Sequence, residues 1–104
     1  MRFDVDWSHG AEHMRSGHQL SVEHANEALA DDECIVADPD PASRSGQSAR
    51  VIGYSSAAAA VLVVILVHRQ DRPGAWWGAN GWRASSTERR TYWEQTEQKG
   101  SSDE

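Results

Sequence analysis

The sequence contains a single cysteine, Cys34, so the chain cannot form an internal disulfide, which fits a reducing compartment. Its longest apolar run, residues 57–67, has 11 residues, whereas a membrane-spanning helix needs about 20. The opening MRFDVDW carries acids where a secretory signal has a basic patch and an apolar stretch. We therefore expect a cytoplasmic protein without a membrane segment.

Positive charge is also scarce, and it is unevenly distributed along the chain. The net charge is −6 overall, with −8 in residues 1–40, +5 in residues 41–93 and −3 in residues 94–104. All basic residues of the middle block are arginines, whose guanidinium groups bind phosphate bidentately. This block indicates nucleic-acid binding, and the alternative is that its arginines only solvate the faces of strands and helices.

The 104 residues suffice for one domain, which we place at residues 1–98, followed by a disordered tail at 99–104. Apolar periodicity and capping residues set the order of the elements. Gly17 reads as a helix stop and Ser21 as an N-cap, and Ser85 forms a capping box with Glu88. We predict strands at 2–6, 33–37, 50–54, 61–68 and 75–80, and helices at 7–15, 22–30 and 86–97.

This order predicts an α+β fold with a small antiparallel sheet, two N-terminal helices and one C-terminal helix. Five tryptophans are many for so short a chain. Trp76 and Trp77 are adjacent in one predicted strand, so at least one of them must face away from the buried side of the sheet. An exposed Trp suits stacked bases or a protein partner, and core packing is the alternative.

Three segments occur in an order typical of one family. Residues 5–7 are Val-Asp-Trp and precede residues 17–25, in which His18, Ser21, Glu23 and Ala25 stand at matching positions. Residues 50–55 read Arg-Val-Ile-Gly-Tyr-Ser before a valine-rich strand, and residues 83–92 read Arg-Ala-Ser-Ser-Thr-Glu-Arg-Arg-Thr-Tyr. Together they resemble the BrnT family, the toxins of bacterial toxin–antitoxin pairs.

The resemblance implies a RelE-like fold and a ribonuclease toxin that needs no metal or other cofactor and is silenced by a BrnA-like antitoxin. In such enzymes the ribose 2′-hydroxyl attacks the adjacent phosphate of RNA. The protein then supplies groups that transfer protons near neutral pH and cations that stabilise the transition state.

The candidate residues follow from these needs. Arg50 and Arg83 would contact the scissile phosphate, and His18 or Tyr92 would transfer protons. Further candidates would bind RNA, namely Arg69, Arg89, Arg90, Trp77 and Trp82. The structural alternatives are a cross-strand ion pair for Arg50, a solvated loop side chain for Arg83, a turn hydrogen bond for His18 and core packing for Tyr92.

Two departures from the family pattern favour a second hypothesis. The segment with Trp77 and Trp82 replaces one that carries arginines in the family, and the chain is acidic where such toxins are basic. A non-catalytic relative that acts as a protein-interaction module fits these departures. A third class, a domain with a small-molecule ligand, has no pocket signature. His68 has no motif support, and His9 and His13 do not form a zinc motif.

Overall fold

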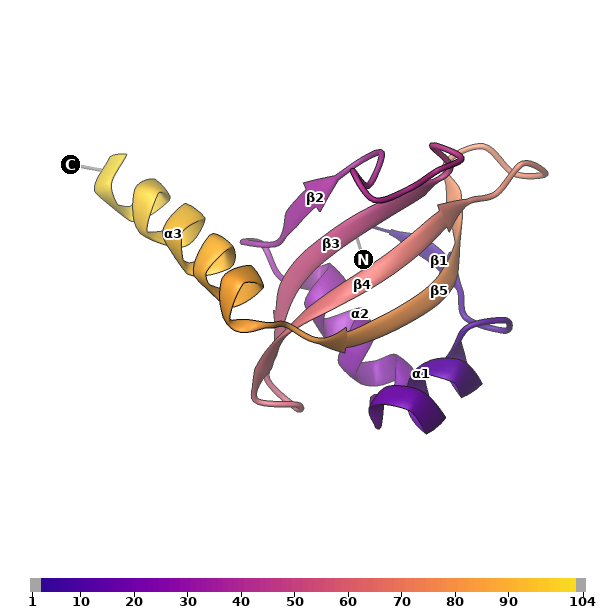
Figure 1. The fold of residues 1–104 in the computed structure, drawn as a ribbon, viewed down its shortest axis with the longest axis horizontal. Helices are drawn as coiled ribbons and strands as arrows, with labels where there is room; N and C mark the ends of the chain where they lie inside the picture. Colours follow the sequence, from indigo (N-terminus) through magenta and orange to yellow (C-terminus); the bar gives the residue numbers. More distant parts are fainter. Residues whose placement is uncertain (1–2, 103–104) are drawn as a thin grey trace.

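The computed structural model describes residues 3–102, which form five strands and three helices (Figure 1). The element order confirms the predicted α+β class. In chain order the elements are β1 (Asp4–Asp6), α1 (Ala11–His18), α2 (Val22–Ala30), β2 (Ile35–Ala37), β3 (Ser48–Ser55), β4 (Ala60–His68), β5 (Ala75–Arg83) and α3 (Ser86–Ser102). Within the described part, none of these helices is both long and apolar enough to cross a membrane.

The sheet has the strand order β1-β5-β4-β3-β2. Strands β2 to β5 form an antiparallel meander, but β1 pairs with β5 in parallel. The predicted antiparallel sheet is therefore correct for β2 to β5 but not for the edge strand β1, and the sheet is mixed. The reason lies in α1 and α2, which carry the chain from one edge of the sheet to the other and so allow a parallel edge strand.

The main core lies between the sheet and the two N-terminal helices. Alternate side chains of the central strands point to this side and are fully buried, as expected for period-two strands. The cluster includes Met14, Leu20, Leu29, Val51, Leu62, Val64 and Leu66. Trp76 packs against it while Trp77 belongs to the opposite face, so the prediction for this adjacent pair is confirmed.

Close packing between the helices and the sheet requires glycine at several positions, and Gly53 and Gly78 are two of them. A Cβ atom at Gly53 would lie 2.2 Å from the carbonyl oxygen of Ala28, so α2 can approach β3 only over a glycine. A Cβ atom at Gly78 would lie 2.3 Å from the ring of Trp7. Both positions therefore set the distance between the helical layer and the sheet.

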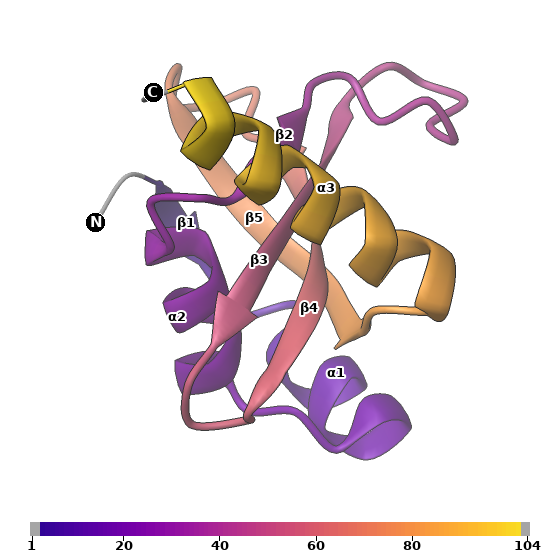
Figure 2. The same cartoon turned by 90° about the vertical axis from the view of Figure 1, so that its left-hand side faces the viewer.

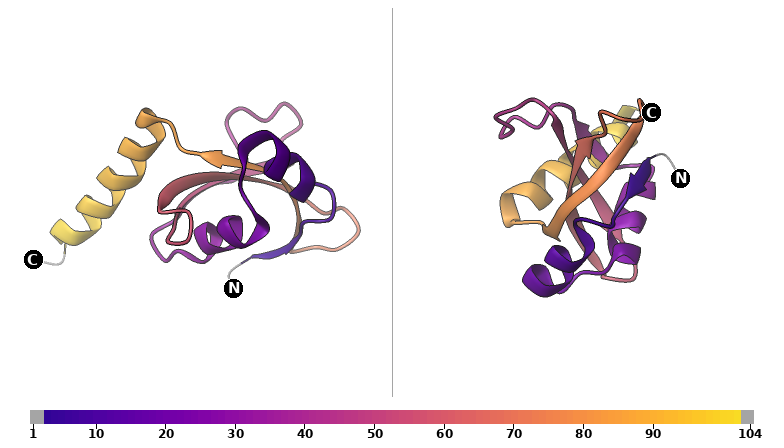
Figure 3. Two further views of the ribbon diagram at one scale, coloured as in Figure 1. Left: turned by 90° about the horizontal axis from the view of Figure 1, so that it is seen from below. Right: turned by 90° about the vertical axis from the view of Figure 1, so that its right-hand side faces the viewer.

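The opposite face of the sheet is the α3 face, defined here by Ile35, Arg50, Ile52, Val63 and Trp82. Figure 3 shows that α3 leaves the end of β5 and extends away from the sheet, while α1 and α2 lie on the other side. Figure 2 shows α3 passing in front of β3 and β4, the strands on which it packs. A second, smaller core forms there around Tyr92 and Ala84.

The first helix differs from its prediction over residues 7–15. It begins at Ala11 because the carboxylate of Asp6 accepts the backbone N–H of Ser8 at 2.8 Å and its hydroxyl at 2.6 Å, which favours a turn over residues 8–10. Gly17 is not the stop, since the helix continues to His18. Gln19 takes the left-handed conformation instead, with φ 57°.

The other helices begin as predicted. The hydroxyl of Ser21 accepts the N–H of His24, and the N–H of Ser21 donates to the His24 ring. At the start of α3 the hydroxyl of Ser85 accepts the N–H of Glu88 at 3.2 Å, and the Glu88 carboxylate accepts the N–H of Ser85 at 2.7 Å. Both N-caps are confirmed.

The remaining differences concern where elements end. Strand β5 continues to Arg83, beyond the predicted end at residue 80, because β4 offers partners as far as Leu62. Helix α3 continues to Ser102, beyond the predicted end at residue 97, since residues 94–99 are rich in helix-forming Glu, Gln and Lys. Residues 99–102 of the predicted disordered tail are therefore helical, and residues 103–104 lie outside the described part.

Candidate nucleic-acid interface

The junction between β5 and α3 brings together three of the predicted residues. Arg83 is the last residue of β5 and is exposed, and its Nη1 lies 3.5 Å from the backbone carbonyl oxygen of His18. His18 is the last residue of α1, and its ring centroid lies 6.2 Å from that of Trp82. Trp82 pairs with Val63 and its side chain lies on the α3 face, whereas Arg83, the next residue of the strand, leaves the opposite face. His18 lies at the end of the strand near both, with its backbone carbonyl toward Arg83 and its ring toward Trp82.

Two further arginines belong to this junction because they occupy the first turns of α3. Arg89 donates from Nη1 to the carbonyl oxygen of Ala84 at 2.9 Å, which holds its guanidinium beside the end of β5. Arg90 is exposed on the same helix. With Arg83 they give the junction three cations within eight residues of sequence. This arrangement suits a phosphate backbone.

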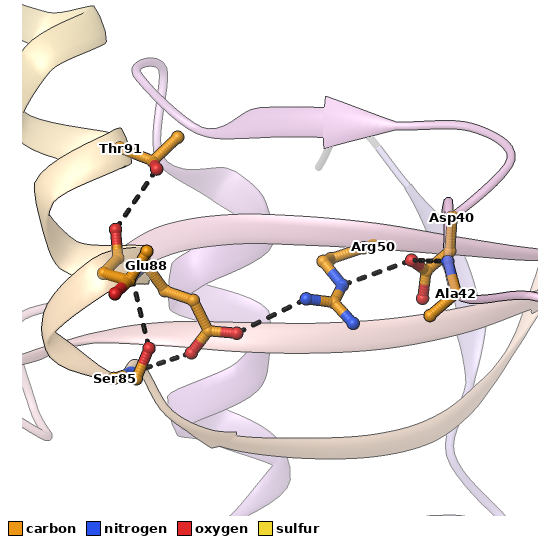
Figure 4. A network of polar contacts seen from close by, with 7 residues as sticks. Asp40, Ala42, Arg50, Ser85, Glu88 and Thr91 are labelled. Carbon is orange, nitrogen blue, oxygen red and sulfur yellow. Dashed lines mark hydrogen bonds and ion pairs between the residues drawn. The ribbon is translucent and has the colours of Figure 1, made fainter.

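Arg50 lies farther along the α3 face and is already engaged by carboxylates (Figure 4). Its Nε is 3.3 Å from Oδ1 of Asp40, and its Nη1 is 3.3 Å from Oε2 of Glu88. The guanidinium carbon lies 5.8 Å from the centroid of the Trp82 ring. Arg50 thus forms ion pairs, as its structural alternative proposed. Its partners come from a loop and a helix, however, and not from a neighbouring strand.

The second aromatic–cation pair, Arg69 with Trp77, is a separate cluster at the opposite end of β5. The Arg69 guanidinium lies 4.0 Å from the Trp77 ring centroid and also bonds Asp71 at 2.8 and 3.1 Å. Asp6 is 3.7 Å away, and the His9 ring meets Trp77 edge-on at 4.7 Å. Arg69 thus covers a face of Trp77 that a base would need for stacking.

Tyr92 lies in the small core under α3 and is 3% exposed. Its hydroxyl donates to Oδ2 of Asp31 at 2.5 Å, and the same oxygen accepts the N–H of Tyr54 at 2.8 Å. Burial, and then the hydrogen bond to Asp31, raise the pKa of Tyr92 well above its usual value. The hydroxyl is therefore directed at the end of α2 rather than at His18, and it fastens α3 to the rest of the domain.

Sequence reasoning missed the carboxylates that hold these groups. Glu88 was expected only as a capping residue, and Asp40 and Asp31 were not singled out. The capping box was a visible signal for the position of Glu88, but its second partner is 38 residues away in sequence. Asp40 lies in a loop without periodicity, so nothing in the sequence indicated that it is buried, with 7% exposure.

The other histidines lie apart from the junction or lack a metal-binding arrangement. His68 contacts Asp38 at 3.0 Å and stacks on Trp76 at 4.0 Å, which places it at the far end of β4. The rings of His13 and His18 are 6.3 Å apart. Among the residues that the structure describes, no three His, Cys, Asp or Glu side chains are grouped as a metal site would require.

In comparisons with known proteins, no family model matches the chain. No curated protein is similar enough to it to count as a relative.

Proposed function

We propose that the protein is a BrnT-like ribonuclease toxin, which cleaves RNA in the cytoplasm without a metal ion and is silenced by a BrnA-like antitoxin. The observation that carries the proposal is the position of His18 at the β5–α3 junction, with its backbone carbonyl 3.5 Å from Nη1 of Arg83 and its ring centroid 6.2 Å from that of Trp82. These residues come from segments 65 positions apart in the chain, and the fold brings them to the same end of the strand. The α+β order of the elements is compatible with this assignment.

The geometry gives each group a role in RNA cleavage. Arg83 would bind the scissile phosphate and stabilise the negative charge that develops as the 2′-hydroxyl attacks. His18 would transfer a proton, since an imidazole can both donate and accept one and the residue is only partly buried. Trp82 would stack a base beside the cleaved bond, and Arg89 and Arg90 would hold the adjacent phosphates. Tyr92 has a positioning role in this scheme, because its hydroxyl is bonded to Asp31.

The experiment is cleavage of a labelled single-stranded RNA by the purified protein in EDTA. We expect EDTA-resistant cleavage that falls by at least about 100-fold in Arg83→Ala and in His18→Gln, the scale of a lost acid–base or charge-stabilising group. Arg44→Ala is the matched control, because Arg44 is an exposed arginine in the loop between β2 and β3. Equal losses in all three variants, or no cleavage by folded protein, would refute the proposal.

A second function, a non-catalytic protein-interaction module, is favoured by one observation. Arg50 and Arg69, two of the cations proposed for RNA, already contact two carboxylates each. A folded protein that neither cleaves nor binds RNA, yet binds a candidate antitoxin tightly, would support this function instead of the ribonuclease.

A further inference from the structure

Arg50 is held on the α3 face by contacts that are loose for a charged pair. Both of its ion-pair distances are 3.3 Å, whereas tight guanidinium–carboxylate bonds measure about 2.7–2.9 Å. Its Nε is buried and makes no hydrogen bond within the described residues. The guanidinium therefore retains donor capacity that a better-placed acceptor would use.

The two carboxylates around Arg50 are fixed to different degrees. Asp40 is 7% exposed, its Oδ1 accepts the N–H of Ala42 at 3.0 Å, and its own N–H donates to Ser48 at 2.8 Å. Glu88 is 20% exposed and stands in the first turn of α3, where its Oε1 accepts the N–H of Ser85 at 2.7 Å. Glu88 is thus the more exposed of the two carboxylates and the one that a solvent anion can reach and displace, whereas Asp40 is buried.

Charge decides what Arg50 can bind while Glu88 is in place. One guanidinium and two carboxylates sum to a local charge of −1, which repels a phosphate group. Once Glu88 leaves, Arg50 and Asp40 are neutral together, and a phosphate can replace the lost carboxylate. The position lies beside Trp82, so a phosphate there would belong to the strand that crosses the β5–α3 junction.

The site also has room for such a group. A hollow of about 270 Å³ borders Arg50, and its walls come from β2, β3, the loop after β2 and α3. Its lining is mainly apolar, with Ile35, Pro41 and Ile52 among the residues, and it also includes Asp40 and Thr91.

We propose that Glu88 is an internal competitor that closes a second phosphate subsite at Arg50, and that an RNA phosphate opens the subsite by displacing it. This rests on the proposed function, because RNA supplies the phosphate. The same carboxylate caps α3 through Ser85, so opening the subsite releases the first turn of that helix as well.

The test compares Glu88→Gln with the wild type, using inorganic phosphate as the probe. The Gln amide oxygen still accepts the N–H of Ser85, so the capping box survives while the competing charge is removed. We expect Glu88→Gln to bind phosphate about tenfold more tightly than the wild type, with a shift of the Trp82 indole N–H signal in NMR. Glu94→Gln, an exposed position on the same helix, is the matched control and should bind like the wild type.

Three outcomes separate the possibilities. If Glu88→Gln and the wild type bind phosphate with equal affinity, the proposal that Glu88 competes for Arg50 is refuted. It is also refuted if the Glu88→Gln/Arg50→Gln double variant still binds phosphate more tightly than the wild type. If Glu88→Gln does not fold, saturating phosphate should shift the Arg50 Nε–H and Glu88 carboxylate signals of the wild type together, and unchanged signals refute the proposal. A gain at Arg50 without RNA cleavage by the wild type upholds the competitor and refutes the ribonuclease.

Discussion

Replacing Tyr92 by phenylalanine removes one oxygen atom and, with it, the hydrogen bond that joins α3 to the end of α2. The ring keeps its place in the small core, since Tyr92 is 3% exposed and only its hydroxyl contacts Asp31. A hydrogen bond to a charged acceptor contributes about 1.5–3 kcal/mol. Oδ2 of Asp31 keeps the N–H of Tyr54, so we expect a loss near the middle of this range, about 2 kcal/mol.

Such a loss is measurable by urea and thermal unfolding followed by circular dichroism. For a domain of this size it corresponds to a fall in Tm of roughly 8–16 °C. Tyr54→Phe is the matched control, because that residue bonds Asp31 through its backbone and its side chain is exposed. A Tyr92→Phe variant as stable as Tyr54→Phe would refute the view that this bond fastens α3.

The pH dependence gives a second readout of the same bond. The pKa of Tyr92 is raised above its ordinary value of 10.0 by burial and by the bond to Asp31. A group with a raised folded pKa stabilises the protein fully below its unfolded pKa, and this contribution is lost as the pH rises through the folded value. The wild type should therefore lose stability above about pH 10 relative to Tyr92→Phe.

Two further predictions concern packing and acid stability. Gly53→Ala should destabilise the domain by about 1–3 kcal/mol, because the added Cβ would collide with the carbonyl oxygen of Ala28. Gly17→Ala should instead stabilise α1 by about 0.5–1 kcal/mol, because nothing lies within 4 Å of its Cβ position. Urea unfolding of both variants measures the two changes in the free energy of unfolding. Hydrogen bonds from Ala57 and then Ser55 hold the pKa of Glu27 below its ordinary value, so its contribution is present above pH 4.5 and is lost as the pH falls through the folded pKa. Glu27→Gln should therefore be less stable than the wild type at pH 7 and equal to it in acid, and an equal gap at both pH values would contradict this.

The sequence predicted best where local signals are strong. Ser21, Ser85 and Glu88 cap helices through contacts within three residues, and the valine-rich run from 61 has no good alternative to a buried strand. The start of α1 was missed because the Asx turn at Asp6 competes with helix formation in a way that apolar periodicity does not register.

The candidate site was only partly visible for a different reason. The residue types that suit RNA could be named from the sequence, but their neighbours depend on contacts across the sheet. Arg50 was expected either to contact phosphate or to form a cross-strand ion pair, and its two carboxylates come instead from a loop and from a distant helix. Likewise, Trp77 looked like a stacking platform until Arg69 was found against its ring. Long-range ion pairs leave no periodic trace in a sequence.

The parallel edge of the sheet has a consequence for how the chain assembles. Asp4 pairs with Ala75, so β1 and β5 are about 70 residues apart in the chain. Closing so long a loop costs entropy before the pairing stabilises anything, which makes such contacts slow to form. During synthesis β1 emerges before β5 and has no partner until β5 is complete. The edge of β5 then stays unpaired until β1 docks on it. Of the strands in this sheet, the first along the chain is thus the last one placed, and it shields only Ala75–Trp77 of the β5 edge from pairing with other chains.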